Sequence, residues 1–319
     1  MDRPDGGLTP AAGPQLLDEL LTRCRFPPAG TDVVCAVSGG ADSLALLALA
    51  TAAGLRVTAV HVDHGLRPDS ADEAAVVAAA AERFGAAFRA ERVDVADGGD
   101  LEQRARQARR AVLGPDALTG HTADDQAETV LLNLLRGAGP PGLAAMTSAG
   151  THPILDLRRA ETVALCAALG LTPVQDPSNT DPRFQRNRIR NEVLPLLADV
   201  ARRDPVPLLV RTADHARTLT ADVDALAADL DPTDSRALAA APPSLAVAAL
   251  RRWLRDEAGH PPSTAELERA LAVARHEVVA CELTGGRRLR RTDGVLRLEP
   301  PQDRPANAAD GSGEADRGS

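Results

Sequence analysis

The feature that most constrains the fold is an alternation of strand-like and helix-like runs between residues 31 and 135. Apolar, β-branched runs predict strands, and the Ala- and Leu-rich or amphipathic runs between them predict helices. Because the connections are short, the pattern predicts an α/β fold with a parallel sheet and helices on both faces. The expected strands are 31–37, 56–62, 87–95 and 115–120, and the expected helices are 42–53, 69–84, 100–113 and 122–135.

The rest of the chain predicts a smaller, mostly helical domain that ends in a short β-meander. Pro205 and Pro207 mark the expected boundary. Gly285-Gly286 and Asp293-Gly294 are hairpin-turn sequences within the expected meander. Further helices are expected near 159–169, 208–229, 244–258 and 263–275, and the meander at 278–298. The predicted parts are an N-terminal segment with one helix (1–30), the α/β domain (31–204), the smaller domain (205–300) and a disordered tail (301–319).

The first expected strand runs into the hexapeptide Ser38-Gly39-Gly40-Ala41-Asp42-Ser43 and then into a helix. Backbone amides at a helix N-terminus bind phosphate oxygens, and glycines let that backbone approach closely. The chain contains no lysine, which excludes a Walker-type phosphate lysine. Asp42 therefore fits a ligand of Mg²⁺ that bridges to the phosphates. The alternative is a plain strand-to-helix turn, but the complete hexapeptide resembles the pyrophosphatase-loop (PP-loop) pattern, which favours the phosphate site.

Two further clusters follow expected strands. His61, Asp63 and His64 follow no standard zinc-ligand spacing, so a nucleotide-side role for this cluster, and for His61 in it, is favoured over a metal site. The alternative is a strand end whose polar residues only satisfy the following loop. In the segment 120–129, Thr122 is a plausible N-cap for the next helix. Because the carboxyl ends of parallel strands meet at one edge of the sheet, we expect these clusters near the phosphate loop.

The acidic residues that follow Thr122 suit a cation. Asp124 and Asp125 fall in the first helical turn, where the helix dipole stabilises carboxylates. Asp125 and Glu128 are three residues apart and share one helix face. They could receive either Mg²⁺ or an amine substrate. Favourable capping alone is the alternative interpretation.

Arginines gather in two segments. Residues 101–110 place four arginines on one expected helix, usually the sign of a solvated face. Residues 183–203 contain six arginines against two acids, which reverses the net charge of −9 locally. Such a segment can follow a nucleic-acid backbone.

Composition sets the remaining bounds. The four cysteines form no CxxC pair, which argues against a disulfide or metal framework. The polar N-terminus lacks a signal peptide, and the longest apolar stretch is too short to cross a bilayer. We therefore expect a soluble, cytoplasmic protein without a membrane partner.

Together these motifs resemble the tRNA(Ile)-lysidine synthetase family, in its short two-domain form, within the PP-loop ATP pyrophosphatase superfamily. The resemblance rests on SGGADS, HVDHGLR, LEQRAR, residues 120–146, residues 176–195 and the C-terminal LTGGRRLRRTDGVLRLE. Two positions depart from the family pattern. His152 stands where arginine is usual, and Ala111 stands where an aromatic residue is common.

The resemblance implies an adenine-nucleotide α-hydrolase-like fold and a ligase that forms a carbon–nitrogen bond. Such an enzyme adenylates the wobble cytidine of the isoleucine tRNA with a CAU anticodon. It then joins free L-lysine to that cytidine, forming lysidine with release of AMP and pyrophosphate. Residues 31–204 would be the ATP-binding catalytic domain and residues 205–300 the tRNA-interacting domain. ATP and Mg²⁺ are the implied cofactors, and the oligomeric state is left open between a monomer and a homodimer.

The resemblance also distributes roles among the candidate residues. The implied catalytic residues are Asp42, His121 and Asp125. Those implied for ATP are Ser38, Gly39, Gly40, Ala41, Asp42, Ser43, His61 and Arg106. Those implied for lysine or tRNA are Asp125, Glu128, Arg186, Arg188 and Arg190. Asp42 and Asp124 are the implied Mg²⁺ ligands.

Two rival interpretations stand beside this one. The first is another PP-loop adenylating enzyme, either a tRNA thiolase or an amide-forming synthetase; the lack of a CxxC pair argues against a thiolase. The second is a nucleotide-binding module without catalysis. Such a module would be expected to keep the loop but not Asp42 together with Asp125 and Glu128.

Overall fold

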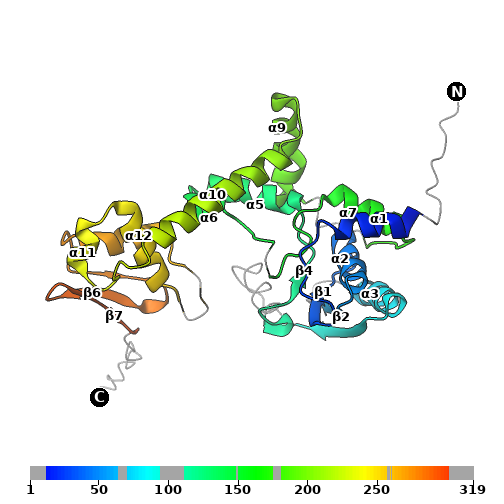
Figure 1. Cartoon of the computed structure of the whole chain (residues 1–319), viewed down its shortest axis with the longest axis horizontal. Helices are drawn as coiled ribbons and strands as arrows, with labels where there is room; N and C mark the ends of the chain where they lie inside the picture. The colour runs from blue at the N-terminus through cyan, green and yellow to red at the C-terminus, as the bar shows by residue number, and fades with distance from the viewer. Residues whose placement is uncertain are drawn as a thin grey trace, which may run out of the picture. The chain divides into compact units, whose positions relative to one another are not determined.

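The structure is a computed structural model that describes residues 12–63, 70–93, 111–148, 150–174, 181–256, 259 and 261–301. The chain divides into two compact units, Met1–Arg217 and Thr218–Ser319 (Figure 1). The division falls inside helix α10 (Val206–Leu226), whereas the domain boundary predicted between 204 and 205 falls just before that helix. Pro207 lies in the first turn of α10. Backbone amides of a first turn have no acceptor within the helix, so the amide hydrogen that proline lacks costs no helical hydrogen bond.

The first unit contains a parallel sheet with the strand order β3-β2-β1-β4. Its central strand β1 pairs in parallel with β2 on one side and with β4 on the other. The α/β fold with a parallel sheet is therefore confirmed. The strands are β1 (Asp32–Ala36), β2 (Arg56–Asp63), β3 (Ala87–Arg92) and β4 (Leu118–Thr119).

Strand β4 is much shorter than the 115–120 expected. Gly114 has a φ of +82°, and residues 115 and 116 form a turn. Pro115 has no amide hydrogen to donate to a ladder. Only Leu118 and Thr119 therefore pair with β1, beside Cys35 and Ala36.

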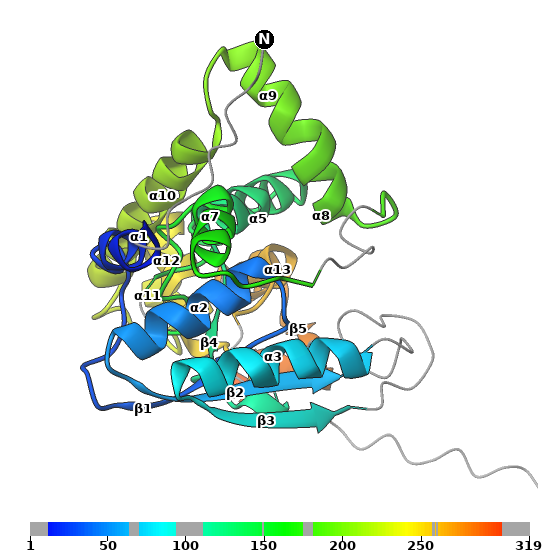
Figure 2. The same cartoon turned by 90° about the vertical axis from the view of Figure 1, so that its right-hand side faces the viewer.

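Both faces of the sheet are covered. On one face, α2 (Ala41–Ala52) and α3 (Ser70–Phe84) lie over the strands (Figure 2), and α2 is buried along most of its length. On the other face, Ala36 and Val60 pack with Leu113, the last residue of the described helical turn 111–113. The rest of the helix expected at 100–113 lies outside the described residues.

The remaining helices of the first unit bring distant segments to the sheet. Helix α7 packs against both α1 and α2, and Leu165 and Cys166 of α7 enter the main core. These elements are α1 (Ala12–Leu21), α5 (Ala123–Leu135), α6 (Pro140–Leu143), α7 (Arg159–Ala168), α8 (Gln185–Arg188), the π-helix η2 (Ile189–Val193) and α9 (Leu194–Ala201).

The second unit packs three helices with a three-stranded antiparallel sheet of order β5-β6-β7. Leu250, Leu254, Leu289 and Leu296 form the centre of its core. The elements are α11 (Ser235–Ala240), α12 (Pro243–Trp253), α13 (Thr264–Ala274), β5 (Ala280–Glu282), the 3₁₀ turn η3 (Thr284–Gly286), β6 (Arg288–Thr292) and β7 (Val295–Glu299). The predicted helical domain with a terminal meander is thus confirmed.

The turn between β6 and β7 shows how the meander is encoded. Asp293 and Gly294 have φ values of +52° and +83°. Two successive positive φ angles suit a tight hairpin turn, and Asp-Gly is a sequence that tolerates them. No helix among the described residues is long and apolar enough to cross a membrane.

Candidate active site

The phosphate loop lies between β1 and α2, as the sequence predicts. Gly39 has a φ of +86°, and a Cβ added there would come within 3.1 Å of the Val174 side chain. The Ser43 hydroxyl donates to the Gly40 carbonyl at 2.9 Å and accepts from the Ser38 amide at 3.1 Å. Since α2 begins at Ala41, the loop presents the free amides of a helix N-terminus, which suit a phosphate group.

The loop after β4 lies directly against the start of α2. A Cβ added to Gly120 would fall 2.7 Å from the Asp42 carbonyl oxygen. Only glycine therefore allows this backbone approach. It brings His121 and the beginning of α5 next to the phosphate loop, although Asp42 and Gly120 are far apart in the sequence.

His61 lies at the end of β2 beside the same loop. Its side chain is 2% exposed, and its Nδ1 lies 3.1 Å from the Val37 carbonyl oxygen. The carbonyl can only accept, so Nδ1 carries the hydrogen and Nε2 is left as an acceptor. Nε2 is buried and has no hydrogen-bond partner among the described residues. A buried polar atom without a protein partner is a position where a water or a ligand can donate a hydrogen bond.

Asp42 extends from the first turn of α2 toward α7. Its carboxylate accepts a hydrogen bond from the Thr162 hydroxyl and another from Arg159 Nε, at 3.3 Å. Burial raises the pKa of Asp42 above its usual range, although the Thr162 bond and the Arg159 charge oppose that shift. A cation near Asp42 would therefore favour the charged carboxylate.

Asp124 and Asp125 occupy the first turn of α5, but in different environments. Asp124 accepts from Arg158 Nε at 3.0 Å and from the Arg159 amide at 2.8 Å. Asp125 closes a capping box with Thr122, whose amide donates to Asp125 Oδ2 at 2.9 Å. Its other oxygen accepts from Arg159 Nη2 at 2.8 Å. Burial would raise the pKa of both carboxyls, but the arginines and amide donors outweigh it and hold each pKa below its usual value.

Glu128 is completely buried and is surrounded by three guanidinium groups. It accepts from Arg159 Nη1 at 3.1 Å, from Arg186 Nε at 2.9 Å and from Arg190 Nε at 2.7 Å. Arg186 and Arg190 therefore form ion pairs with a buried carboxylate and do not contribute to an open basic face. Arg188 differs, since it is exposed and pairs with Glu192 at 2.9 Å.

His121 forms a close group with Thr119 and His152. The Thr119 Oγ1 lies 2.8 Å from His121 Nδ1 and 2.7 Å from His152 Nδ1. The two Nδ1 atoms are 3.2 Å apart, and the rings meet edge to face.

Among the other candidate residues, Arg106 lies outside the described residues.

Sequence reasoning missed the residues of α7 that complete the site. The single guanidinium group of Arg159 contacts three carboxylates, those of Asp42, Asp125 and Glu128. One signal was present: Arg158 and Arg159 lie at the start of an expected helix, where the dipole disfavours cations. Arginines in that position indicate that carboxylates lie nearby.

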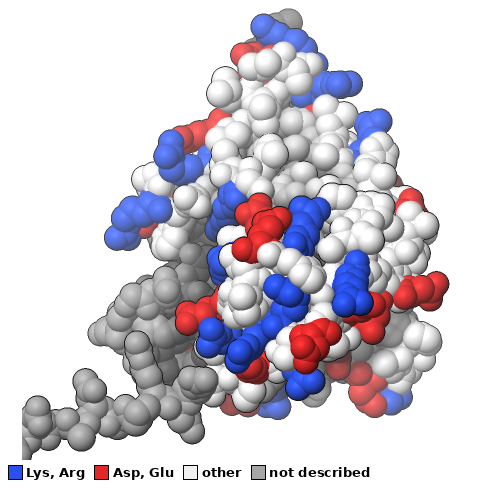
Figure 3. Space-filling view, turned by 90° about the vertical axis from the view of Figure 1, so that its left-hand side faces the viewer, with Lys and Arg blue, Asp and Glu red and all other residues white. Residues whose placement is uncertain are grey.

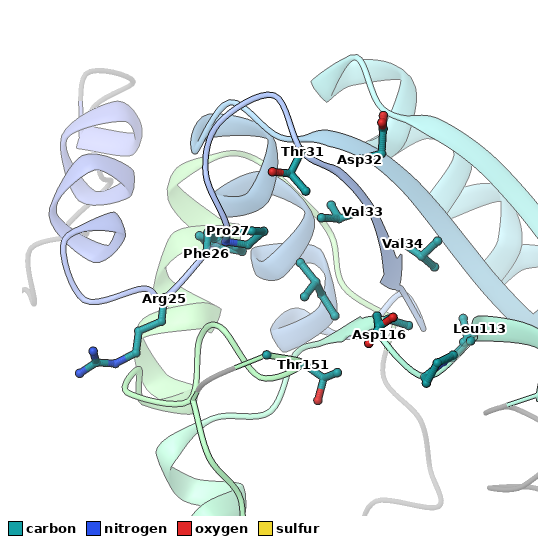
Figure 4. Close-up of a pocket in the computed structure, with 15 residues that line it drawn as sticks. Arg25, Phe26, Pro27, Thr31, Asp32, Val33, Val34, Leu113, Asp116 and Thr151 are labelled. Carbon is teal, nitrogen blue, oxygen red and sulfur yellow. The ribbon is translucent and has the colours of Figure 1, made fainter. Parts of the chain in front are cut away.

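A pocket of about 560 Å³ lies elsewhere, along the beginning of β1 (Figure 4). Phe26, Val33, Val34 and Leu118 give it a largely apolar lining. The phosphate loop follows the opposite end of β1, so this pocket is not the candidate nucleotide site.

Comparison with known proteins agrees with this geometry. Residues 16–197 match the PP-loop domain family, and residues 234–297 match the TilS substrate binding domain family. The tRNA(Ile)-lysidine synthase of Nocardia farcinica is 47% identical over 259 residues, which cover 76% of this chain and 81% of that protein. The chain belongs to the tRNA(Ile)-lysidine synthase family. The lysidine synthase of Thermobifida fusca is 40% identical over 305 residues, covering 85% of this chain and 93% of that protein.

Among solved structures, the fold resembles the U34-tRNA thiolase NcsA from Methanococcus maripaludis with its [4Fe-4S] cluster. The TM-score is 0.52 at 16% identity, over 63% of this chain and 77% of the thiolase. This likeness supports the PP-loop fold of the lysidine synthase family and carries no information on the reaction.

Proposed function

We propose that this chain is an ATP-dependent ligase that forms lysidine on tRNA(Ile). The observation that carries the proposal is that Arg159 joins the phosphate loop to the acidic start of α5. A site for adenylation and a site for an amine are thereby adjacent. In the proposed reaction, the cytosine carbonyl oxygen attacks the α-phosphate of ATP and pyrophosphate leaves. The lysine ε-amine then attacks the activated ring carbon, and AMP leaves.

The residues around the phosphate loop fit ATP. The loop offers the first amides of α2 to phosphate oxygens, and Gly39 adopts the positive φ with which the chain enters this turn. The buried Nε2 of His61 needs a hydrogen-bond donor, which the amino or hydroxyl groups of a nucleoside provide. These two features support the binding of phosphates and nucleoside to the same strand ends.

Of the two carboxylates expected to hold Mg²⁺, Asp42 fits better. Both oxygens of Asp124 are bonded to Arg158, and one of them also accepts from a backbone amide. Asp42 lies on the phosphate loop, and its bond to Arg159 is 3.3 Å long, whereas the two bonds between Arg158 and Asp124 are 3.0 and 3.1 Å long. We assign the metal role to Asp42 alone. Bound Mg²⁺ would offset the negative charge that builds on the departing pyrophosphate.

For lysine, we propose that Asp125 binds the ε-ammonium group. In the described structure, the Arg159 guanidinium occupies the position that such a cation needs beside Asp125. Lysine binding would therefore require Arg159 to withdraw from Asp125. Glu128 is fully buried and holds three arginines, so its role is to fix those arginines rather than to touch the amine. His121 is the proposed acceptor of the ammonium proton.

For tRNA, we propose contacts from both units. Arg183 and Arg188 are exposed in the first unit, and Arg290 and Arg297 are exposed on the sheet of the second. Figure 3 shows arginine and acidic side chains interspersed on one face of the molecule. Phosphate contacts are thus proposed at separate arginines rather than over one uniformly basic surface. The homodimer stays a prediction.

The test is the complete reaction with isotope-labelled lysine. The chain is incubated with tRNA(Ile) carrying a CAU anticodon, ATP and Mg²⁺, and the digested nucleosides are analysed by mass spectrometry. We expect a labelled lysidine nucleoside that requires ATP. Asp42→Asn should keep the fold by circular dichroism and lose at least about a hundredfold in pyrophosphate release. Transfer to the tRNA of sulfur, or of no group at all, would contradict the proposal.

A further inference from the structure

The group formed by Thr119, His121 and His152 brings two imidazoles onto one hydroxyl oxygen. The Oγ1 of Thr119 lies within hydrogen-bond distance of both Nδ1 atoms and can also donate to the Thr151 carbonyl oxygen, at 3.1 Å. A hydroxyl donates only one hydrogen. At least one of the two imidazoles must therefore donate its own Nδ1–H to Thr119, whichever way the hydroxyl points.

When the Thr119 hydroxyl turns from the Thr151 carbonyl to His152, one arrangement satisfies both histidines and connects them. His121 donates Nδ1–H to Thr119 Oγ1, and the Thr119 hydroxyl donates to a bare Nδ1 on His152. The Nδ1 atoms are also 3.2 Å apart, close enough for direct sharing of a proton. In this arrangement, the Nε2 of His121 has no hydrogen and can act as a base.

We infer that His152 and His121 form one proton-accepting unit, in which His152 sets the protonation state at which His121 takes a proton. The inference rests on the proposed function, because the proton comes from the ε-ammonium group of lysine. The N–H bond of the ammonium breaks and a His121 Nε2–H bond forms. His121 then releases its Nδ1 proton to the Thr119 oxygen, and the hydroxyl passes its own proton to His152 Nδ1. Lysine becomes a neutral amine, and His152 becomes the imidazolium.

His152 is a positioning residue in this scheme, since it acts through His121. One charged group coupled to the pair is Asp125 of α5, whose pKa the His121 charge helps to lower. The other contacts described for the pair come from uncharged Thr119 of β4 and from Thr151. Two imidazoles that share a proton hold it more tightly than one imidazole does. As the pH is lowered, the pair should therefore become protonated, and lysine transfer should fall, at a higher pH than with a single histidine.

Arginine at position 152 would change this unit completely. A guanidinium only donates, so it cannot accept the Thr119 hydrogen. The relay would be cut, and a fixed positive charge would disfavour protonation of His121. Arginine at this position would therefore give a different acid–base unit, and His152 makes this chain's unit titratable.

The experiment compares His152→Gln and His152→Arg with the parent, and uses His215→Gln as the matched control. His215 is exposed on α10 and is not part of the group formed by Thr119, His121 and His152. The rate of lysine transfer is measured as a function of pH in single turnovers of adenylated tRNA, separately from pyrophosphate release. We expect the acid limb to move to lower pH in the order parent, Gln, Arg, with a shift of about one unit or more for Arg. At neutral pH, His152→Gln should slow transfer about tenfold with pyrophosphate release unchanged.

A second readout does not depend on activity. Imidazole nitrogen signals of the ligand-free, ¹⁵N-histidine-labelled chain should show coupled titration of His121 and His152. Coupling should vanish in His152→Gln and persist in His215→Gln. Independent titration of the two rings, or a loss of transfer by the same factor at every pH, would overturn the inference. A parent chain that transfers no lysine would instead overturn the proposed function, and the nitrogen signals would still decide the pair.

Discussion

Arginines are arranged differently in the two units. In the first unit, Arg159, Arg186 and Arg190 converge on Glu128, a carboxylate with no exposure to solvent. In the second unit, Arg290 lies directly across from Arg297 on the outer face of the sheet. The same side chain thus stabilises a buried anion in one place and faces a like charge in the other.

The difference indicates where an external anion would be favourable. Like charges directly opposite each other on a sheet destabilise it, so the Arg290–Arg297 pair favours a negatively charged partner. Among the described residues, neither arginine has an ion pair. The arginines around Glu128 already have their partner. Neutralising the two sets should therefore have opposite consequences for stability and for tRNA binding.

The largest effect is expected at Glu128. Glu128→Gln keeps the shape but leaves three guanidiniums around a neutral group, and removing one member of a buried ionic cluster costs about 3–5 kcal/mol. Urea unfolding followed by circular dichroism should show this loss in the unit that contains Glu128. An unfolding curve equal to that of the parent would mean that the three arginines find other partners.

Replacing both Arg290 and Arg297 by Gln should weaken tRNA binding about tenfold at 0.1 M salt and reduce the slope of log K against log salt by about 2. Stability should stay constant or rise, because a like-charge pair is removed. Filter binding over a salt series measures the first effect. Arg275→Gln, at an exposed arginine outside the sheet, is the control. An unchanged salt slope would remove this sheet from the tRNA surface.

A smaller effect concerns Glu266, which closes the capping box of α13 and accepts from the Thr284 amide at 2.6 Å. Burial would raise the pKa of Glu266, but the bonds from Ser263 and Thr284 outweigh it and lower the pKa to about 2 from 4.5. The charged form therefore stabilises the second unit above pH 4.5, and that stability is lost as the pH falls toward 2. Glu266→Gln should cost about 1–2 kcal/mol at pH 7 and flatten this acid dependence. Thermal unfolding between pH 2 and 7 measures both.

The smallest effect is expected at Arg188. It lies two residues after Arg186 on the same short helix, but its partner Glu192 is exposed. Arg188→Gln should change stability by less than about 0.5 kcal/mol, since exposed i,i+4 pairs contribute little. Arg186→Gln is the matched comparison and should cost several times more. Equal losses would show that burial of Glu128 does not govern the energy of these pairs.

The parts of the site that could be predicted from sequence are encoded locally. The phosphate loop, Asp42 and the capped start of α5 each lie within a short segment, and strand alternation places their ends together. The parallel sheet of the first unit and the terminal meander of the second follow from the same patterning. These features depend on residues that are neighbours in the chain.

The arginine contacts could not be predicted in this way. Arg159 reaches Asp42 across 117 positions, and Arg190 reaches Glu128 across 62. Such pairings depend on how α7 and the helices after residue 184 pack. The sequence indicated an open basic segment at 183–203 because nothing local shows that Arg186 and Arg190 have a buried anion. The short β4 was also missed, although Gly114 and Pro115 were visible.

The close approach at Gly120 has a consequence for how this site can vary. Two backbone segments meet there with room for a single hydrogen atom, so the spacing between the phosphate loop and the segment that carries His121 is set by main-chain atoms. Side chains at the rim can then be exchanged without moving the reacting groups relative to one another. The residue at position 152 could therefore change and alter the acid–base behaviour of the site, while the alignment of its two half-reactions stayed the same.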